Sequence, residues 1–306
     1  MILAVCLNPA VDVTYSVAAL RYGTSHRIAA VHRRAGGKGV NVARVLAQVG
    51  EPVAVCGFAG GGTGRWLRDE LAGSGVADRL TGIDGETRQS VAVVDEADAT
   101  VFNEPGPPVR DADFSGLADT FEQQLAGCAA VVMSGSVPPG APVDAYARLV
   151  LLARRHGVPT VVDTSGAQLR SAADAGATVL APNRDEVGVA SGDPAALLEA
   201  AAELSRRSGG TAVVSAGRDG LVAVDGEHHW RALPPRQVTG NPTGAGDALS
   251  AGLARGLAHG SPWPLVLADS LALAAAAVAA PVAGQVELSL YRELAAVPTV
   301  EEVPCP

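Results

Sequence analysis

The stretch Asn241–Asp247, NPTGAGD, leads directly into the apolar-periodic segment Ala248–Gly260, ALSAGLARGLAHG. Two glycines allow the backbone of this turn to approach a bulky ligand closely, and the exposed N–H groups of a first helical turn attract phosphate oxygens. An acid at that junction is placed to take a proton from an attacking hydroxyl. Asp247 is therefore the candidate catalytic base of a phosphoryl transfer. The alternative is that Asp247 is only a helix N-cap, a position that favours aspartate.

A second glycine turn, Ala35–Asn41 (AGGKGVN), holds the only lysine of the chain. Lys and Arg together number 23, and Lys38 is the one lysine among them. An ammonium is a compact point charge whereas a guanidinium is a wide planar fork, so a tight glycine pocket can accept the first and exclude the second. We therefore expect Lys38 to be functional. The alternative is a single lysine left by chance on a surface loop.

Composition limits the class of protein. The 306 residues are 48% hydrophobic and 18% charged, which is typical of a globular chain, and the net charge of −9 argues against a nucleic-acid partner. We expect no signal peptide, because an apolar strand follows Met1 at once, and no membrane contact, because the most apolar region, residues 265–280, is shorter than a span. The spacing of Cys6, Cys56, Cys128 and Cys305 predicts buried thiols in a reducing compartment. A cytoplasmic location follows.

Short apolar runs alternate with longer helical patterns along the chain. The predicted strands are Leu3–Cys6, Val53–Gly57, Val131–Ser134, Thr160–Asp163, Thr178–Ala181, Ala212–Ser215 and Leu221–Val224, and the clearest predicted helices are Thr63–Gly73, Pro142–His156, Pro194–Ser208 and Gly244–His259. Such strands separated by helices indicate an α/β fold in which helices cover both faces of a mainly parallel sheet. We expect one domain over residues 1–306.

Two segments break this alternation. Residues 11–34 and 87–104 alternate apolar with polar residues and contain turn signals in place of helices. Each is typical of a hairpin with one solvated face. Together they predict a small antiparallel β lid that excludes water from a site.

Several polar groups follow predicted strands, where a parallel-sheet enzyme places its ligands. Asn183 and Glu186 fit a hydrated Mg²⁺, or they simply cap a helix. Asp12 is suited to sugar hydroxyls, or it only begins a hairpin. Arg88 is suited to a bidentate phosphate contact, or it is a solvated arginine. The remaining strand-end loops contain Ser136, Ser215, Gly217 and Gly220. There is no GxxxxGK[ST] motif, so a P-loop nucleotide site is excluded.

The motifs Gly36–Asn41 and Thr243–Asp247, with Asn183, Glu186, Gly217 and Gly220 between them, resemble those of the PfkB (ribokinase-like) carbohydrate kinase family. The resemblance spans essentially the whole chain. Residues 7–12 (LNPAVD), 87–89 (TRQ) and 103–106 (NEPG) are similar to the 1-phosphofructokinase and tagatose-6-phosphate kinase branch. The implied fold is a three-layer α/β/α sandwich with a small β lid.

The resemblance implies transfer of the γ-phosphate of ATP to a primary hydroxyl of a ketohexose phosphate. Asp247 would be the base and the backbone of Gly244, Ala245 and Gly246 the anion hole. The nucleotide and its Mg²⁺ would meet Asn183, Glu186, Ser215, Gly217 and Gly220, with Mg²⁺ carried by ATP, reached by Glu186 through water and held by no protein cage. The sugar and its phosphate would contact Asp12, Gly36, Gly37, Lys38, Asn41, Arg88 and Ser136.

One residue departs from the pattern. Many relatives have Lys before Pro-Asn where this chain has Ala181, so nucleotide phosphate contacts are weaker here or come from Arg184. Two other functions stay open: a kinase for an unphosphorylated sugar or nucleoside, and a non-catalytic sugar-phosphate sensor. A homodimer formed through the lid is a further expectation from the family and from the exposed edges of a small sheet.

Overall fold

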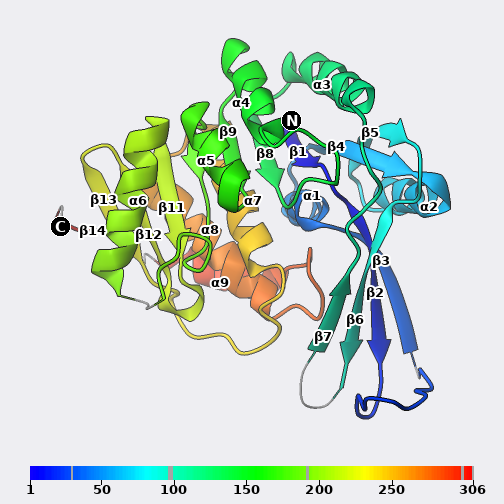
Figure 1. Cartoon of the computed structure of the whole chain (residues 1–306). Helices are drawn as coiled ribbons and strands as arrows, with labels where there is room; N and C mark the ends of the chain where they lie inside the picture. Colours follow the sequence, from blue (N-terminus) through cyan, green and yellow to red (C-terminus); the bar gives the residue numbers. More distant parts are fainter. Residues whose placement is uncertain (29, 96–98, 191–192, 298–299, 305–306) are drawn as a thin grey trace.

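The computed structural model describes the chain except residues 29, 96–98, 191–192, 298–299 and 305–306. A large sheet forms the middle layer of an α/β/α arrangement, and a smaller sheet extends from one side of it (Figure 1). The strands of the large sheet, in spatial order, are β14 (Val300–Glu302), β13 (His228–Ala232), β12 (Leu221–Asp225), β11 (Thr211–Ser215), β10 (Val179–Leu180), β9 (Thr160–Asp163), β8 (Ala130–Ser134), β1 (Ile2–Cys6), β4 (Val53–Gly60) and β5 (Ala77–Ile83).

The pairing in this sheet is parallel from β11 to β5 and antiparallel from β11 to β14. The predicted mainly parallel sheet is thereby confirmed. Strands β5, β13 and β14 carry mixed polar residues and were not predicted, because they lie toward the ends of the sheet, where one face or edge meets water. The predicted strand at residues 178–181 is shorter than expected.

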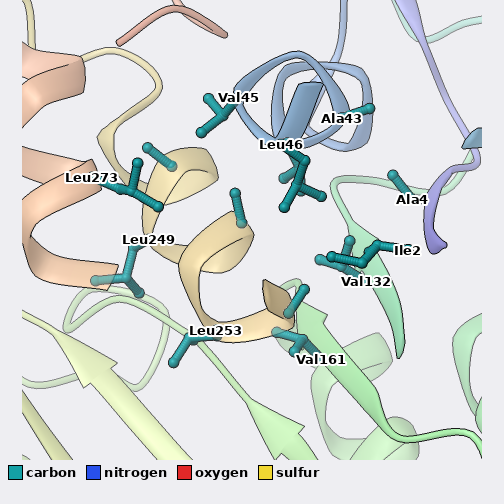
Figure 2. Close-up of a cluster of buried hydrophobic side chains, with 14 of the residues drawn as sticks. Ile2, Ala4, Ala43, Val45, Leu46, Val132, Val161, Leu249, Leu253 and Leu273 are labelled. Carbon is teal, nitrogen blue, oxygen red and sulfur yellow. The ribbon is translucent and has the colours of Figure 1, made fainter. Parts of the chain in front are cut away.

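Side chains of β1 alternate between the two faces of the sheet. Ile2 and Ala4 belong to one buried cluster, whereas Leu3 and Val5 belong to the other, as the two-residue period of a strand requires. Figure 2 shows the first cluster, in which Leu46 points toward Ile2 and Val132 of the sheet. Leu249 lies beside Leu273 of a neighbouring helix. Both faces of the large sheet are therefore buried from solvent, and this explains why the central strands are apolar throughout.

The helices divide between these two faces. One face is covered by α1 (Lys38–Gln48), α2 (Gly61–Ala72), α7 (Ala245–His259) and α8 (Trp263–Val278), and the other by α3 (Asp111–Leu125), α4 (Ala145–Arg155), α5 (Gly166–Asp174) and α6 (Pro194–Ser208). Helix α9 (Leu288–Ala295) packs on α8. Within the described ranges, no helix combines the length and apolar character needed to cross a membrane.

The smaller sheet has the order β3 (Ala30–Gly36), β2 (Ala10–Ser16), β6 (Arg88–Val94) and β7 (Ala99–Asn103). Its two hairpins, β2–β3 and β6–β7, are antiparallel as predicted, but the strands that join them, β2 and β6, run parallel. The periodicity of the sequence predicts that each segment is a hairpin, but it does not predict how the two hairpins pair with each other. Residue 29 and residues 96–98 of the predicted lid segments lie outside the described residues.

The described cysteines are free thiols, with Cys6 and Cys56 buried and Cys128 partly buried. Burial raises the pKa of Cys56 to about 12 and that of Cys6 to about 11, so both stay protonated. Cys305, the fourth cysteine of the prediction, lies outside the described residues.

Candidate active site

Asp247 lies in the first turn of α7 and lines a cavity. The N-cap of this helix is Gly244, whose φ of +90° is the left-handed conformation that favours glycine, and a Cβ there would be 2.9 Å from Cα of Ala283. Asp247 is the third helical residue, and its Oδ2 accepts a hydrogen bond of 2.8 Å from Nδ2 of Asn41. The alternative that Asp247 is the N-cap is therefore wrong.

The carboxyl group of Asp247 is held where ionisation is unfavourable. Burial raises its pKa to about 7, and the charge of nearby Asp163 acts in the same direction, while the hydrogen bond from Asn41 opposes both. Burial likewise raises the pKa of Asp12 to about 6 against the opposing charge of Arg88. A carboxyl group with a pKa near 7 suits a general base that works at neutral pH.

Two cavities meet beneath the smaller sheet. One, of about 350 Å³, is lined by the predicted residues Asp12, Gly37, Lys38, Asn41, Arg88, Asn183, Ser215, Gly244, Gly246 and Asp247. The other, of about 690 Å³, is lined by Lys38, Arg88, Ser136 and Glu186, together with Cys6, Asn8, Ser134 and Gln168. Lys38, Arg88 and Asn103 line both. The structure thus brings together residues from the ends of strands in both sheets and from the first turns of α1, α5 and α7.

Two of the three residues predicted to form an anion hole lie at the smaller cavity, and the role itself stays a prediction. Gly244 and Gly246 line the smaller cavity, but the N–H of Ala245 donates to the carbonyl of Pro242 at 3.2 Å. That bond engages one of the three predicted amides within the turn itself. The N–H groups of Gly246 and Asp247 belong to the first helical turn, where no preceding carbonyl is in reach of an α-helical bond.

Lys38 stands between two carboxylates. Its Nζ lies 3.1 Å from Oδ1 of Asp163 and 3.7 Å from Oε1 of Glu186. Burial lowers the pKa of Lys38, but the charges of Asp163 and Glu186 outweigh burial and hold it above its ordinary value. Asp163 was missed from the sequence, although it is an acid at the end of a predicted strand, the same signal that selected the other site residues.

Asn183 and Glu186 are joined by reciprocal hydrogen bonds. Oδ1 of Asn183 accepts from the N–H groups of Asp185 and Glu186, both at 3.0 Å, while Oε2 of Glu186 accepts from the N–H of Asn183 at 2.9 Å. The hydrogen bonds of the capping alternative are present, but they close a turn at residues 184–188 and do not cap a helix. Because Oε1 of Glu186 still faces the ion pair with Lys38, these bonds do not exclude a further role at the site.

Arg88 is fixed, not solvated. Its Nε donates to the carbonyl of Asn8 at 3.1 Å and its Nη1 to that of Glu104 at 3.3 Å. Asn8 in turn donates to Oγ of Ser136 at 3.3 Å and to the carbonyl of Pro105 at 3.1 Å. Buried Asn8 thus ties the two predicted phosphate ligands to one framework.

Some predicted residues lie at the margin of the cavities. A Cβ on Gly36 would be 2.0 Å from Oδ2 of Asp12, and one on Gly220 would be 2.1 Å from the carbonyl of Ala232, so close packing explains both glycines. Gly217 begins a short 3-10 turn with φ of +61°. None of the three lines either cavity, and their ligand roles stay predictions.

Ala181 lines the smaller cavity, as the departure from the family pattern implied. Arg184, the suggested replacement, instead pairs with Asp185 and Asp219, each at 3.6 Å. Among the residues that the structure describes, no group of three or more His, Cys, Asp and Glu side chains has the arrangement of a metal site.

Comparison with known proteins agrees with this geometry. The model of the pfkB family carbohydrate kinases matches residues 2–287. This chain belongs to the pfkB family of carbohydrate kinases. The predicted family is thus confirmed, and the pfkB kinase described here is a phosphotransferase with an alcohol group as acceptor.

Solved structures of similar fold include two phosphofructokinases. A possible 1-phosphofructokinase of Thermotoga maritima is 28% identical over 99% of both chains, with a TM-score of 0.88. Phosphofructokinase-2 of Escherichia coli in complex with fructose-6-phosphate is 26% identical over 96% of this pfkB kinase and 98% of that chain, with a TM-score of 0.85.

The ribokinase of Arabidopsis thaliana, complexed with ribose and ATP, is 20% identical over 97% of this chain and 98% of that one, with a TM-score of 0.75. This likeness shows the fold alone. The ribokinase-like fold predicted for the pfkB kinase is thereby confirmed.

Proposed function

We propose that this protein is an ATP-dependent phosphosugar kinase that transfers the γ-phosphate to a primary hydroxyl of a ketohexose phosphate. The observation that carries the proposal is the position of Asp247: a buried carboxyl group with a raised pKa, in the first turn of α7, beside a cavity that continues to Arg88 and Ser136. The smaller cavity suits the reacting ends of both substrates. The larger one suits the distal phosphate of the sugar.

In this mechanism Asp247 accepts the proton of the attacking hydroxyl as the new P–O bond forms and the bond to the leaving ADP breaks. The transition state of phosphoryl transfer is loose, so the protein mainly positions the reactants and neutralises their oxygens. The first-turn amides of α7 do this for the transferred group. Asn41 holds the carboxylate in one orientation through its bond of 2.8 Å.

The sugar phosphate is assigned to Arg88 and Ser136. Arg88 is fixed by two carbonyls, so little side-chain freedom is lost when a phosphate binds to its guanidinium. Asp12 and Gly37 line the wall where sugar hydroxyls would lie.

The side chains that we assign to the nucleotide and its metal, Asn183, Glu186 and Ser215, offer oxygen ligands, as Mg²⁺ prefers. Mg²⁺ carried by ATP would be met by Glu186 through water, and it would neutralise phosphate charge during transfer. Asn183 and Ser215 would border the nucleotide.

A turnover screen tests the proposal. The protein is assayed with MgATP and fructose 1-phosphate, fructose 6-phosphate or tagatose 6-phosphate, with fructose, ribose and adenosine in parallel. We expect turnover with at least one phosphosugar and a kcat/KM at least about a hundredfold lower for unphosphorylated acceptors, since they lack the charge-assisted contact with Arg88. Preferred turnover of a free sugar or nucleoside would contradict the assignment of Arg88. Binding of a phosphosugar without any turnover would identify a sensor.

A further inference from the structure

Lys38 occupies a position that its predicted role as a sugar-phosphate ligand does not explain. It lines both cavities, so its ammonium lies on the wall that they share. The side chain is 42% exposed, whereas its partner Asp163 is only 5% exposed. The buried carboxylate of Asp163 thus holds the ammonium of Lys38, which stays accessible from the cavities.

Asp163 is built as the anchor of this ammonium. Its Oδ1 lies 3.1 Å from Nζ of Lys38, and its Oδ2 accepts hydrogen bonds from Oγ of Ser134 at 2.8 Å and Oγ of Ser250 at 3.4 Å. Both serines are buried. Because Ser250 lies on α7 one turn after Asp247, the anchor connects the position of the ammonium to the helix that carries the base.

Two cations, Lys38 and Arg88, line both cavities, and several carboxyl groups surround them. The carboxyl groups of Asp12, Asp163, Glu186 and Asp247 all face this region, and each repels an incoming phosphate when ionised. Lys38 lies between two of them. An ammonium has three N–H donors. Asp163 accepts a hydrogen bond from one of these donors at 3.1 Å, whereas Glu186 at 3.7 Å pairs with the charge but is beyond hydrogen-bond distance. Donors of the ammonium therefore remain for a ligand in the cavities.

Arg88, which also lines both cavities, differs from Lys38 in its attachments. Its Nε and Nη1 are bonded to the carbonyls of Asn8 and Glu104, next to Ser136 in the wall of the larger cavity. The fixed guanidinium therefore suits a phosphate that stays in place. The ammonium near Asp247 suits a group that moves between two reactants.

We propose that Lys38 contacts the phosphoryl group during its transfer, and that Asp163 is the positioning residue that holds the ammonium on the shared wall. This inference rests on the proposed kinase function. It departs from the expectation that Lys38 binds the resident phosphate of the sugar. The two roles differ in what the loss of the ammonium changes: a transfer role lowers kcat, whereas a clamp role weakens binding of the phosphosugar.

The test compares Lys38→Gln with Arg88→Gln. The dissociation constant of the phosphosugar is measured by calorimetry without nucleotide, and kcat is measured at saturating MgATP and sugar. For Lys38→Gln we expect kcat to fall about 10²–10³-fold, as when one donor to a transition-state oxygen is lost. The phosphosugar dissociation constant should stay within about threefold of wild type. For Arg88→Gln we expect the reverse: that constant should rise at least about tenfold.

The anchor is tested by a double-mutant cycle. Asp163→Asn should lower kcat about tenfold and leave the phosphosugar dissociation constant unchanged, and the double variant with Lys38→Gln should be no slower than Lys38→Gln alone, because the two residues act as one unit. Arg206→Gln, which removes one charge from an exposed ion pair on α6, is the control and should match wild type. Thermal unfolding checks that every variant is folded.

A Lys38→Gln variant that binds the phosphosugar as poorly as Arg88→Gln but keeps the kcat of wild type would overturn the inference. So would additive effects of Lys38→Gln and Asp163→Asn. If Lys38→Gln does not fold, Lys38→Met and Asp163→Asn carry the same comparison. Absence of turnover by the wild-type protein with every phosphosugar is a different result, because it contradicts the proposed function itself.

Discussion

The carboxyl group of Asp247 makes pH a direct test of the proposed base. Only the ionised form accepts a proton, and burial raises its pKa to about 7. We therefore expect kcat/KM of the free enzyme to rise with pH through a midpoint near 7. A pH–rate profile with the preferred sugar checks this. An acid limb near pH 4, the ordinary range of aspartate, would contradict the assignment.

Replacement of this acid separates activity from stability. We expect Asp247→Asn to bind both substrates but to lose kcat by about 10²–10⁴-fold, the usual contribution of a general base.

The raised pKa means that the folded state holds this proton more tightly than the unfolded state. The stability contributed by the group is thus present below about pH 4 and lost as pH rises through about 7. Asp247→Asn should therefore increase the unfolding temperature at pH 8 more than at pH 5. Near-normal turnover would refute the role of Asp247.

Asp247 and Asp163 also show how far sequence reasoning reaches at the residue scale. A glycine turn before a helix is a local pattern, and it correctly predicted that Asp247 lies in the first turn of α7, whereas its role as base is a proposal. The partners of that base are not local: Asn41 and Asp247 are 206 positions apart, and Lys38 and Asp163 are 125 apart. The sequence gives no indication that residues so far apart in the chain are in contact.

At the scale of elements, α7, the helix that carries Asp247, packs closely against α8. A Cβ on Gly252 would be 2.5 Å from Cα of Ser270, so the two helices cross at van der Waals contact at this point. We expect Gly252→Ala to separate the helices and to lower the free energy of unfolding by about 1–3 kcal/mol, as for other overpacked sites. Chemical denaturation measures the change.

Gly116→Ala is the matched control for this prediction. Gly116 lies within α3 with nothing within 4 Å of an added Cβ. Alanine is the better helix former there, so the free energy of unfolding should rise by roughly 0.5–1 kcal/mol. Equal effects of the two substitutions would show that the packing of α7 against α8 is not the cause.

At the scale of the whole molecule, the smaller sheet has two unlike faces. Asp12, Ser90 and Asn103 are paired across β2, β6 and β7, and all three line the smaller cavity. Adjacent positions on the strands point the opposite way.

The outer face of this sheet is mainly apolar. One row across the strands is Arg33, Val13, Val91 and Phe102, and the next is Val31, Tyr15, Val93 and Thr100. Phe102 is 57% exposed and Val31 is 48% exposed. An apolar face of this kind is typical of a surface that a second copy covers.

The oligomeric state tests this expectation. Light scattering should give the mass of a homodimer, or of a larger assembly, for the wild-type protein at micromolar concentration, and a monomer for Phe102→Asp, because a charge in an apolar contact is left unpaired. Leu265→Asp replaces another exposed apolar residue, on α8, and should leave the mass unchanged. A wild-type monomer would exclude assembly through the lid.

The sequence by itself determined the layers, the apolar central strands, the glycine turn before α7 and the family of the protein, because each depends on periodicity or on residues close together in the chain. The tertiary structure alone decided the parallel junction of β2 with β6 and the anchoring of Lys38 by Asp163. These depend on which strand ends come together and on how burial changes the energy of a charge. Neither is determined until the chain has folded.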